Sequence, residues 1–264
     1  LYFVERTYAI FTSQDLLHWE LLQKFDLPGD DECPDLYPLT ADDGRTLWVY
    51  SGAHDMYFVG DFDENGLYQP IQSVGQLSYN SQSYAAQTYY YEPGKPVIRF
   101  AWNRSDIPGA PFNGSMCTPT EMTLKKHGDR YYLSALPIKS TENLVVKSDK
   151  LDDFTLTHCT HELGSKTCRI SFTVKEGDLT CNLYGLEMKL DKNGLTCGES
   201  ILPRLKNEPM KVDIITDTNS VEIYLNGVAN TVIAHVLDET KPTFTIHAED
   251  PVEVQNLTVS ELSL

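Results

Sequence analysis

Short runs of alternating apolar and polar residues, separated by turn dipeptides, cover most of this chain. Dipeptides such as Asn65-Gly66 and Asn226-Gly227 supply the positive φ angles of tight hairpin turns, and each lies between two such runs. In Ser220–Leu225 the alternation is strict, so its aliphatic residues fall on one face of a strand. Proline and glycine interrupt most long windows, so we expect no long helix. The pattern predicts an all-β chain with strands that include residues 46–51, 87–91, 97–102, 130–135, 169–174 and 220–225.

The pattern changes near Pro137, which divides the chain into two parts. Segments before it are rich in Tyr and Trp and carry proline-containing loops, whereas strands after Leu151 are more regular and richer in Thr. We therefore predict a first domain over residues 1–140, and a β-sandwich with its connector over residues 141–264. At roughly 45 residues for each four-stranded unit, the first domain holds about three blades of a β-propeller. Three blades do not close a ring, so we expect further sequence upstream of Leu1.

Composition narrows the classes of partner. The 38 acidic residues outnumber the 21 Lys and Arg, which gives a formal net charge of −17. Nucleic acid and anionic membrane surfaces need clustered basic residues, so we expect neither as a partner. No apolar run is long enough to span a bilayer. An acidic surface with 15 Tyr and few Lys suits neutral, hydroxyl-rich ligands such as sugars.

The sequence contains no recognisable motif for binding a metal ion or a nucleotide cofactor. The six Cys form no Cys-x-x-Cys pair and the seven His show no His-x-x-x-His spacing, so we expect no metal site. The sequence contains neither a Walker loop nor a Gly-x-Gly-x-x-Gly segment, so we expect no cofactor. Free buried thiols are the simplest interpretation of the cysteines, and a disulfide among the last four is the alternative.

The segment Asp30–Tyr37 is the strongest candidate for chemistry. It places four carboxylates within six positions, just before a predicted strand. Pro34 fixes its own φ and biases Cys33 toward an extended form. Extended geometry would point Glu32 to one side and Asp35 to the other. As a general acid, Glu32 would have to face a sugar-sized hollow rather than bulk water, whereas composition alone favours a solvated acidic turn.

This segment resembles the Glu-Cys-Pro motif of glycoside hydrolase family 32, the β-fructosidases. Other segments resemble family motifs in the same order along the chain, so the resemblance covers nearly all of it. These segments are Ser13–Glu20, Ser51–Ala53 with Val59–Asp63, Tyr84–Thr88, Ala101–Trp102 with Pro111–Met116 and Pro119–Met122, and Asp217–Tyr224. The resemblance implies the later blades of a five-bladed β-propeller followed by a C-terminal β-sandwich, with about two blades upstream.

The resemblance also implies a retaining mechanism with two carboxylates, in which Glu32 is the acid/base. The family nucleophile lies in an Asn-Asp-Pro-Asn motif, and a second aspartate lies in an Arg-Asp-Pro motif. Neither motif occurs in this sequence. The implied substrate is sucrose or a fructan such as inulin or levan. We expect the isolated chain to have little activity.

Four more residues are candidate substrate contacts. Trp102 resembles the family's pocket tryptophan and would stack on sugar C–H groups, with burial in the core as the alternative. Tyr84 would hydrogen-bond a hydroxyl or would pack with its tyrosine neighbours. Cys33 and Asp35 flank the acid, and Cys33 would tune its environment or act as a small apolar residue.

Two further functions are consistent with the sequence. The chain would be a non-catalytic carbohydrate-binding or structural remnant of such an enzyme if it lacked a nucleophile in its natural form. A related propeller hydrolase that acts on arabinan shares the architecture but fits the Glu-Cys-Pro motif less well.

Overall fold

The computed structural model describes residues 2–4, 7–89, 92, 94–106, 109, 111–235, 237–238 and 240–263. The chain forms two compact units. The first contains residues 1–103 and 116–137, and the second contains residues 104–115 and 138–264. The predicted domain limits of 1–140 and 141–264 stay a prediction.

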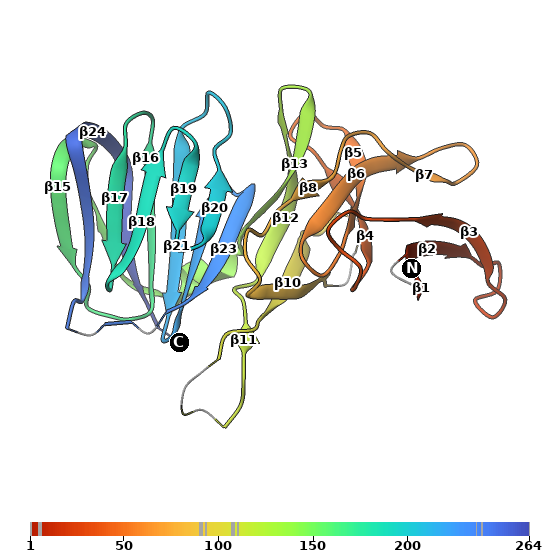
Figure 1. The fold of residues 1–264 in the computed structure, drawn as a ribbon, viewed down its shortest axis with the longest axis horizontal. Helices are drawn as coiled ribbons and strands as arrows, with labels where there is room; N and C mark the ends of the chain where they lie inside the picture. The colour runs from red at the N-terminus through yellow and green to blue at the C-terminus, as the bar shows by residue number, and fades with distance from the viewer. Residues whose placement is uncertain are drawn as a thin grey trace. The chain divides into compact units, whose positions relative to one another are not determined.

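The first unit consists of three antiparallel sheets (Figure 1), in which most neighbouring strands follow one another along the chain. The strands of the first sheet are β1 (Tyr2–Val4), β2 (Thr7–Thr12) and β3 (Glu20–Phe25). Those of the second are β4 (Asp35–Thr40), β5 (Thr46–Ser51), β6 (Met56–Phe62), β7 (Tyr68–Pro70) and β8 (Gly75–Gln76). Those of the third are β9 (Ser83–Thr88), β10 (Val97–Asn103), β11 (Ser115–Met116), β12 (Thr120–His127) and β13 (Arg130–Pro137). The exceptions to the sequential order are β8, which pairs with β6, and β10, which pairs with β12.

Two clusters of buried side chains join these sheets in the order of the sequence. The first and second sheets share a cluster that includes Tyr8, Tyr50 and Tyr68, with Tyr8 edge-on to Tyr50 at 5.2 Å. The second and third sheets share a larger cluster, in which Val49 and Leu133 are almost fully buried. Each sheet therefore packs a face against the next, which is how the blades of a propeller bury their alternating apolar residues.

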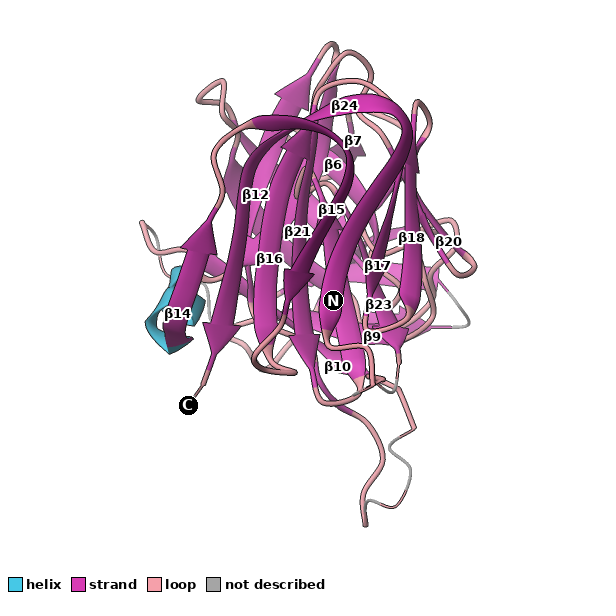
Figure 2. Cartoon of the chain, turned by 90° about the vertical axis from the view of Figure 1, so that its left-hand side faces the viewer, coloured by secondary structure: helices cyan, strands magenta, loops and turns pink. Residues whose placement is uncertain are grey.

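The second unit is built on one hydrogen-bonded sheet that folds into two layers. Its strands are β14 (Val145–Lys150), β15 (Phe154–Glu162), β16 (Cys168–Val174), β17 (Leu179–Leu183), β18 (Leu186–Asp191), β19 (Gly194–Cys197), β20 (Ser200–Pro203), β21 (Met210–Asp217), β22 (Ser220–Leu225), β23 (Ala229–Ala234) and β24 (Thr243–Leu262). A short 3₁₀ helix, η1 (Lys139–Leu144), precedes β14 and is the cyan element in Figure 2.

The long strand β24 connects the two layers. Its first part pairs with β15 and β17, and its last part pairs with β14 and β16. Figure 2 shows the strand curving over the top of the sheet between these two parts. Phe172 of β16 and Phe244 of β24 meet at 6.0 Å in the core between the layers. The unit is therefore a β-sandwich.

The strand predictions are mostly confirmed. Residues 46–51 and 220–225 coincide with β5 and β22. The prediction for residues 87–91 is wrong at both ends, because β9 begins at Ser83 and ends at Thr88, so Tyr89 lies outside the strand; residues 90 and 91 lie outside the described residues. In β22 the polar face is buried as well, and the Tyr224 hydroxyl donates to Glu222 at 2.7 Å. Alternation in this strand therefore marks two buried faces, one aliphatic and one hydrogen-bonded.

Within the described part of the chain, no helix is long and apolar enough to cross a membrane.

All six cysteines are free thiols, and four of them are buried. Burial raises the pKa of Cys168 and Cys197 to about 11 and raises the pKa of Cys181 further still. Because the thiolate is the reactive form, we expect iodoacetamide at pH 8 to label only the half-buried Cys33 and Cys159 in the folded chain, and slowly. Peptide mass spectrometry should find all six labelled in urea; fast labelling of Cys181 without denaturant would contradict this burial.

Candidate active site

Glu32 lies in the loop that enters β4 and is contacted from all three sheets of the first unit. Its backbone carbonyl accepts hydrogen bonds from the Tyr8 hydroxyl at 2.8 Å and from the Ala53 amide at 2.9 Å. Its carboxylate accepts a hydrogen bond from the Tyr84 hydroxyl of β9 through Oε2. The side chain is exposed to solvent. The backbone of Glu32 is thus fixed by the first two sheets and its carboxylate is oriented by the third.

The extended conformation predicted for Cys33 is wrong. Its φ is +48°, in the left-handed region, although it precedes a proline. Its carbonyl accepts a hydrogen bond from the Gln87 side chain at 2.8 Å, and the neighbouring carbonyl of Glu32 has the two partners named above. These tertiary bonds override the local preference of the residue before proline. The prediction that Glu32 and Asp35 point to opposite sides rested on that preference and has no support.

Asp35 connects two strands. Its Oδ1 accepts from the Leu36 amide at 2.9 Å, and its Oδ2 accepts from the Thr88 amide of β9 at 2.5 Å. With both oxygens held by backbone amides, the carboxylate fixes the start of β4 against the end of β9.

Tyr84 and Trp102 are paired across β9 and β10. The register between the two strands shifts beside this pair, and Ala85 has a φ of +51°. An irregularity of this kind re-aims a side chain at the end of a strand. The Tyr84 and Trp102 rings lie 6.5 Å apart, and Trp102 is 41% exposed. The exposed indole argues against the core alternative for Trp102.

Acidic side chains surround the start of β4 and give it a negative electrostatic environment. Burial first, and then the charges of Asp30 and Asp31, raise the pKa of Tyr8, so its hydroxyl stays protonated and remains a donor to Glu32. Burial and the neighbouring Glu32 also raise the pKa of the Cys33 thiol, which therefore stays neutral. Among the described residues, no group of three or more His, Cys, Asp or Glu is arranged to hold a metal ion.

Sequence reasoning missed three residues that shape this site. His54, in the turn between β5 and β6, bonds to the buried Asp30 through its backbone amide and its ring. The adjacent Asp55 forms a buried two-point ion pair with Arg99 of β10, whose guanidinium also donates to Ser83 at 3.0 Å. The only signal in the sequence was the acidic run around Asp30, because each partner lies more than twenty residues away.

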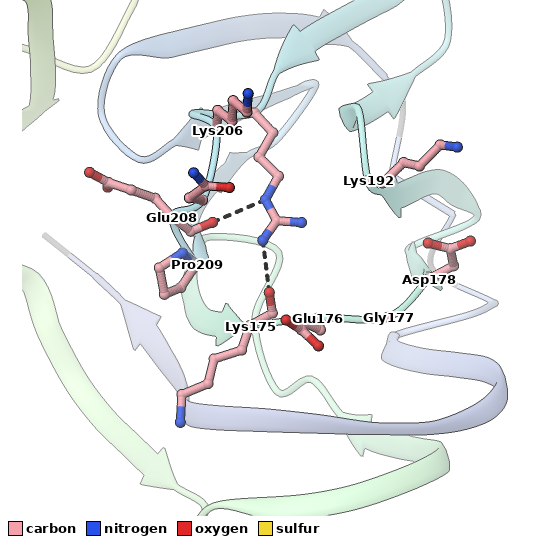
Figure 3. Close-up of a pocket in the computed structure, with 10 residues that line it drawn as sticks. Lys175, Glu176, Gly177, Asp178, Lys192, Lys206, Glu208 and Pro209 are labelled. Carbon is pink, nitrogen blue, oxygen red and sulfur yellow. Dashed lines mark hydrogen bonds between the residues drawn. The ribbon is translucent and has the colours of Figure 1, made fainter. Parts of the chain in front are cut away.

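Cavities are also found in the second unit. One has a volume of about 680 Å³. Arg204 links two segments of this cavity's lining, because its guanidinium donates to the carbonyls of Glu208 at 3.0 Å and Lys175 at 2.8 Å (Figure 3). Its lining is Lys175, Glu176, Gly177, Asp178, Lys192, Arg204, Lys206, Asn207, Glu208 and Pro209. Two further cavities of the second unit have volumes of about 610 and 180 Å³. Glu32 lines none of these three cavities. The sugar-sized hollow expected beside Glu32 stays a prediction.

The first unit thus consists of three sheets that pack in sequence order, with the exposed carboxylate of Glu32 just before β4, and the second unit is a β-sandwich. The family model "Glycosyl hydrolases family 32 N-terminal domain" matches residues 4–135. The chain therefore belongs to glycosyl hydrolase family 32.

Two curated relatives show how far the similarity reaches. The fructan beta-fructosidase of Streptococcus mutans serotype c is 28% identical over 162 residues, which cover 51% of this chain and 11% of that protein. The levanbiose-producing levanase of Bacillus subtilis strain 168 is 26% identical over 204 residues, covering 69% of this chain and 38% of the levanase. The chain thus spans well under half the length of these two relatives.

Solved structures share the fold along nearly the whole chain. The exo-inulinase of Aspergillus awamori matches with a TM-score of 0.77 at 18% identity, covering 98% of this chain and 62% of the inulinase. The beta-fructofuranosidase of Schwanniomyces occidentalis matches with a TM-score of 0.78 at 19% identity, covering 98% and 66%. The three sheets of the first unit are therefore β-propeller blades and the second unit is the β-sandwich, which confirms the predicted fold class.

Proposed function

We propose that the protein carrying this sequence hydrolyses β-fructosyl linkages in sucrose, inulin or levan with retention of configuration, and that Glu32 is its acid/base. Family membership supports the reaction class, and relatives are described as a fructan beta-fructosidase and levanases. The observation that carries the role of Glu32 is its place: an exposed carboxylate whose backbone and side chain are both held by neighbouring blades.

In the first step Glu32 donates a proton to the glycosidic oxygen while a carboxylate nucleophile attacks the anomeric carbon, which forms a fructosyl-enzyme and releases the leaving alcohol. In the second step Glu32, now ionised, takes a proton from the water that attacks this intermediate, and fructose leaves. The 264 residues contain no Asn-Asp-Pro motif, so no residue of this sequence is assigned as the nucleophile.

Tyr84 determines which oxygen of Glu32 carries the proton. Its hydroxyl donates to Oε2, so the acidic hydrogen of the protonated form belongs on Oε1. Trp102 presents an exposed indole beside Tyr84, suited to stacking on the apolar C–H groups of a sugar. As substrate contacts, Cys33 and Asp35 stay predictions; the two backbone bonds of Asp35 favour a role in holding β9 in place.

Methanolysis tests the reaction and its stereochemistry together. When the intact protein that carries this sequence is incubated with sucrose in aqueous methanol, we expect methyl β-fructofuranoside as the transfer product, because two inversions restore the β configuration. NMR spectroscopy of the product distinguishes the anomers. The α anomer would contradict the retaining mechanism, and binding of inulin without release of fructose would favour the non-catalytic alternative.

A further inference from the structure

We propose that Asp30 and His54 form a positioning pair that holds the ring of Tyr84 and, through the Tyr84 hydroxyl, the orientation of the Glu32 carboxylate. This inference rests on the proposed function of Glu32 and adds to it the device that keeps the acid/base in place. His54 and Asp30 act through Tyr84 and do not themselves react.

The first step is the fixing of Asp30. Its side chain is fully buried, and its amide donates to the Leu27 carbonyl at 3.0 Å. Gly52 packs against it so closely that a Cβ at position 52 would clash with the Asp30 carboxyl group and the Tyr8 hydroxyl. A buried carboxylate needs hydrogen-bond partners, and the turn that contains His54 supplies them.

The second step is the fixing of His54. The His54 amide donates to Asp30 Oδ2 at 2.7 Å, and Nδ1 lies 3.1 Å from Oδ1. Because a carboxylate accepts hydrogen bonds, Nδ1 carries the hydrogen, which fixes the tautomer and the plane of the ring. The next residue, Asp55, is bound to the buried Arg99, so the turn is held on both sides of the imidazole.

The third step links the imidazole to the acid/base. The His54 ring meets the Tyr84 ring edge-on, with centroids 4.8 Å apart, and the Tyr84 hydroxyl donates to Glu32 Oε2. Trp102 lies 6.5 Å from Tyr84 by ring centroids. A phenol held by His54 offers Glu32 one donor direction, and a carboxylate held in one direction keeps its protonated oxygen aimed at the leaving group.

A double-mutant cycle on turnover tests this chain of contacts. His54→Asn retains an amide donor for Asp30 and removes the ring, while Tyr84→Phe removes the hydroxyl that reaches Glu32. In the intact protein we expect His54→Asn to lower kcat for sucrose by about tenfold to a hundredfold with little change in KM, as misplaced catalytic groups do. In the Tyr84→Phe background the same substitution should have almost no further effect.

The chain offers a matched control. His18 has its Nδ1 2.7 Å from Asp15, but its side chain is 87% exposed at the tip of the β2–β3 hairpin. His18→Asn should leave kcat unchanged. An unchanged kcat in His54→Asn would overturn the positioning role, and so would an equal loss of kcat in the unmodified and Tyr84→Phe backgrounds. In either case an inactive Glu32→Gln variant would leave the proposed function of Glu32 intact. Normal turnover in Glu32→Gln would overturn both.

A readout that needs no activity is NMR spectroscopy of the intact protein that carries this sequence. The carboxyl ¹³C resonance of Glu32 should move on His54→Asn when Tyr84 is present and stay in place when Tyr84 is Phe. A resonance that does not respond to His54→Asn in either background would also overturn the proposal.

Discussion

Replacement of Glu32 by Gln in the intact protein is expected to lower kcat for sucrose by about 10²- to 10⁴-fold, the usual contribution of a positioned acid/base. Glutamine keeps an oxygen that accepts from Tyr84 but has no acidic hydrogen to donate and no charge to receive one. The side chain is exposed, so we expect the thermal unfolding midpoint to stay the same. Steady-state kinetics with a release assay for fructose measures the effect.

Glu64→Gln is the control for this prediction. Glu64 is also an exposed glutamate, in the turn between β6 and β7, and its replacement should leave turnover unchanged. Turnover of Glu32→Gln within a factor of two of the Glu64→Gln value would remove Glu32 from the mechanism.

Replacement of Arg99 by Met is expected to lower the free energy of unfolding of the first unit by about 3–5 kcal/mol. Arg99 and Asp55 are 6% and 4% exposed by side chain, so the variant leaves a buried carboxylate without its cation. The three Trp of the chain, at positions 19, 48 and 102, all belong to the first unit, so their fluorescence reports its unfolding in urea.

The comparison for this variant is an exposed ion pair. Lys126→Met breaks a pair with Asp43 in which the side chains are 43% and 27% exposed, and its effect on the urea midpoint should be small. If Arg99→Met moves the midpoint no further than Lys126→Met does, the buried pair does not hold the turn that carries His54.

Local rules were sufficient for most of the strands, and the family resemblance singled out Glu32 as the proposed acid/base. Alternation and turn dipeptides marked the bounds of β5 and β22 to the residue, although all six residues of β22 are buried. The Glu-Cys-Pro motif drew attention to Glu32, which the structure holds at the entrance of β4. The resemblance supplied Tyr84, the residue that bonds to Glu32.

Contacts between distant segments were beyond those rules. The left-handed φ of Cys33 depends on a bond from Gln87, and the irregularity at Ala85 depends on the partner strand. His54 and Asp30 are 24 residues apart, and nothing in either local sequence predicts that they pair. The resemblance pointed to Glu32, whereas the contacts around it became visible only in the structure, where segments of three sheets meet.

Azide rescue of Glu32→Ala tests the central claim most directly. With 4-nitrophenyl β-fructofuranoside, whose leaving group needs no proton, the fructosyl-enzyme still forms, and azide attacks it without a base. The account predicts that azide restores turnover of the variant and that the product is β-fructosyl azide, while the unmodified protein continues to yield fructose. If turnover of Glu32→Ala does not respond to azide, or if the variant hydrolyses sucrose as fast as the unmodified protein, Glu32 is not the acid/base.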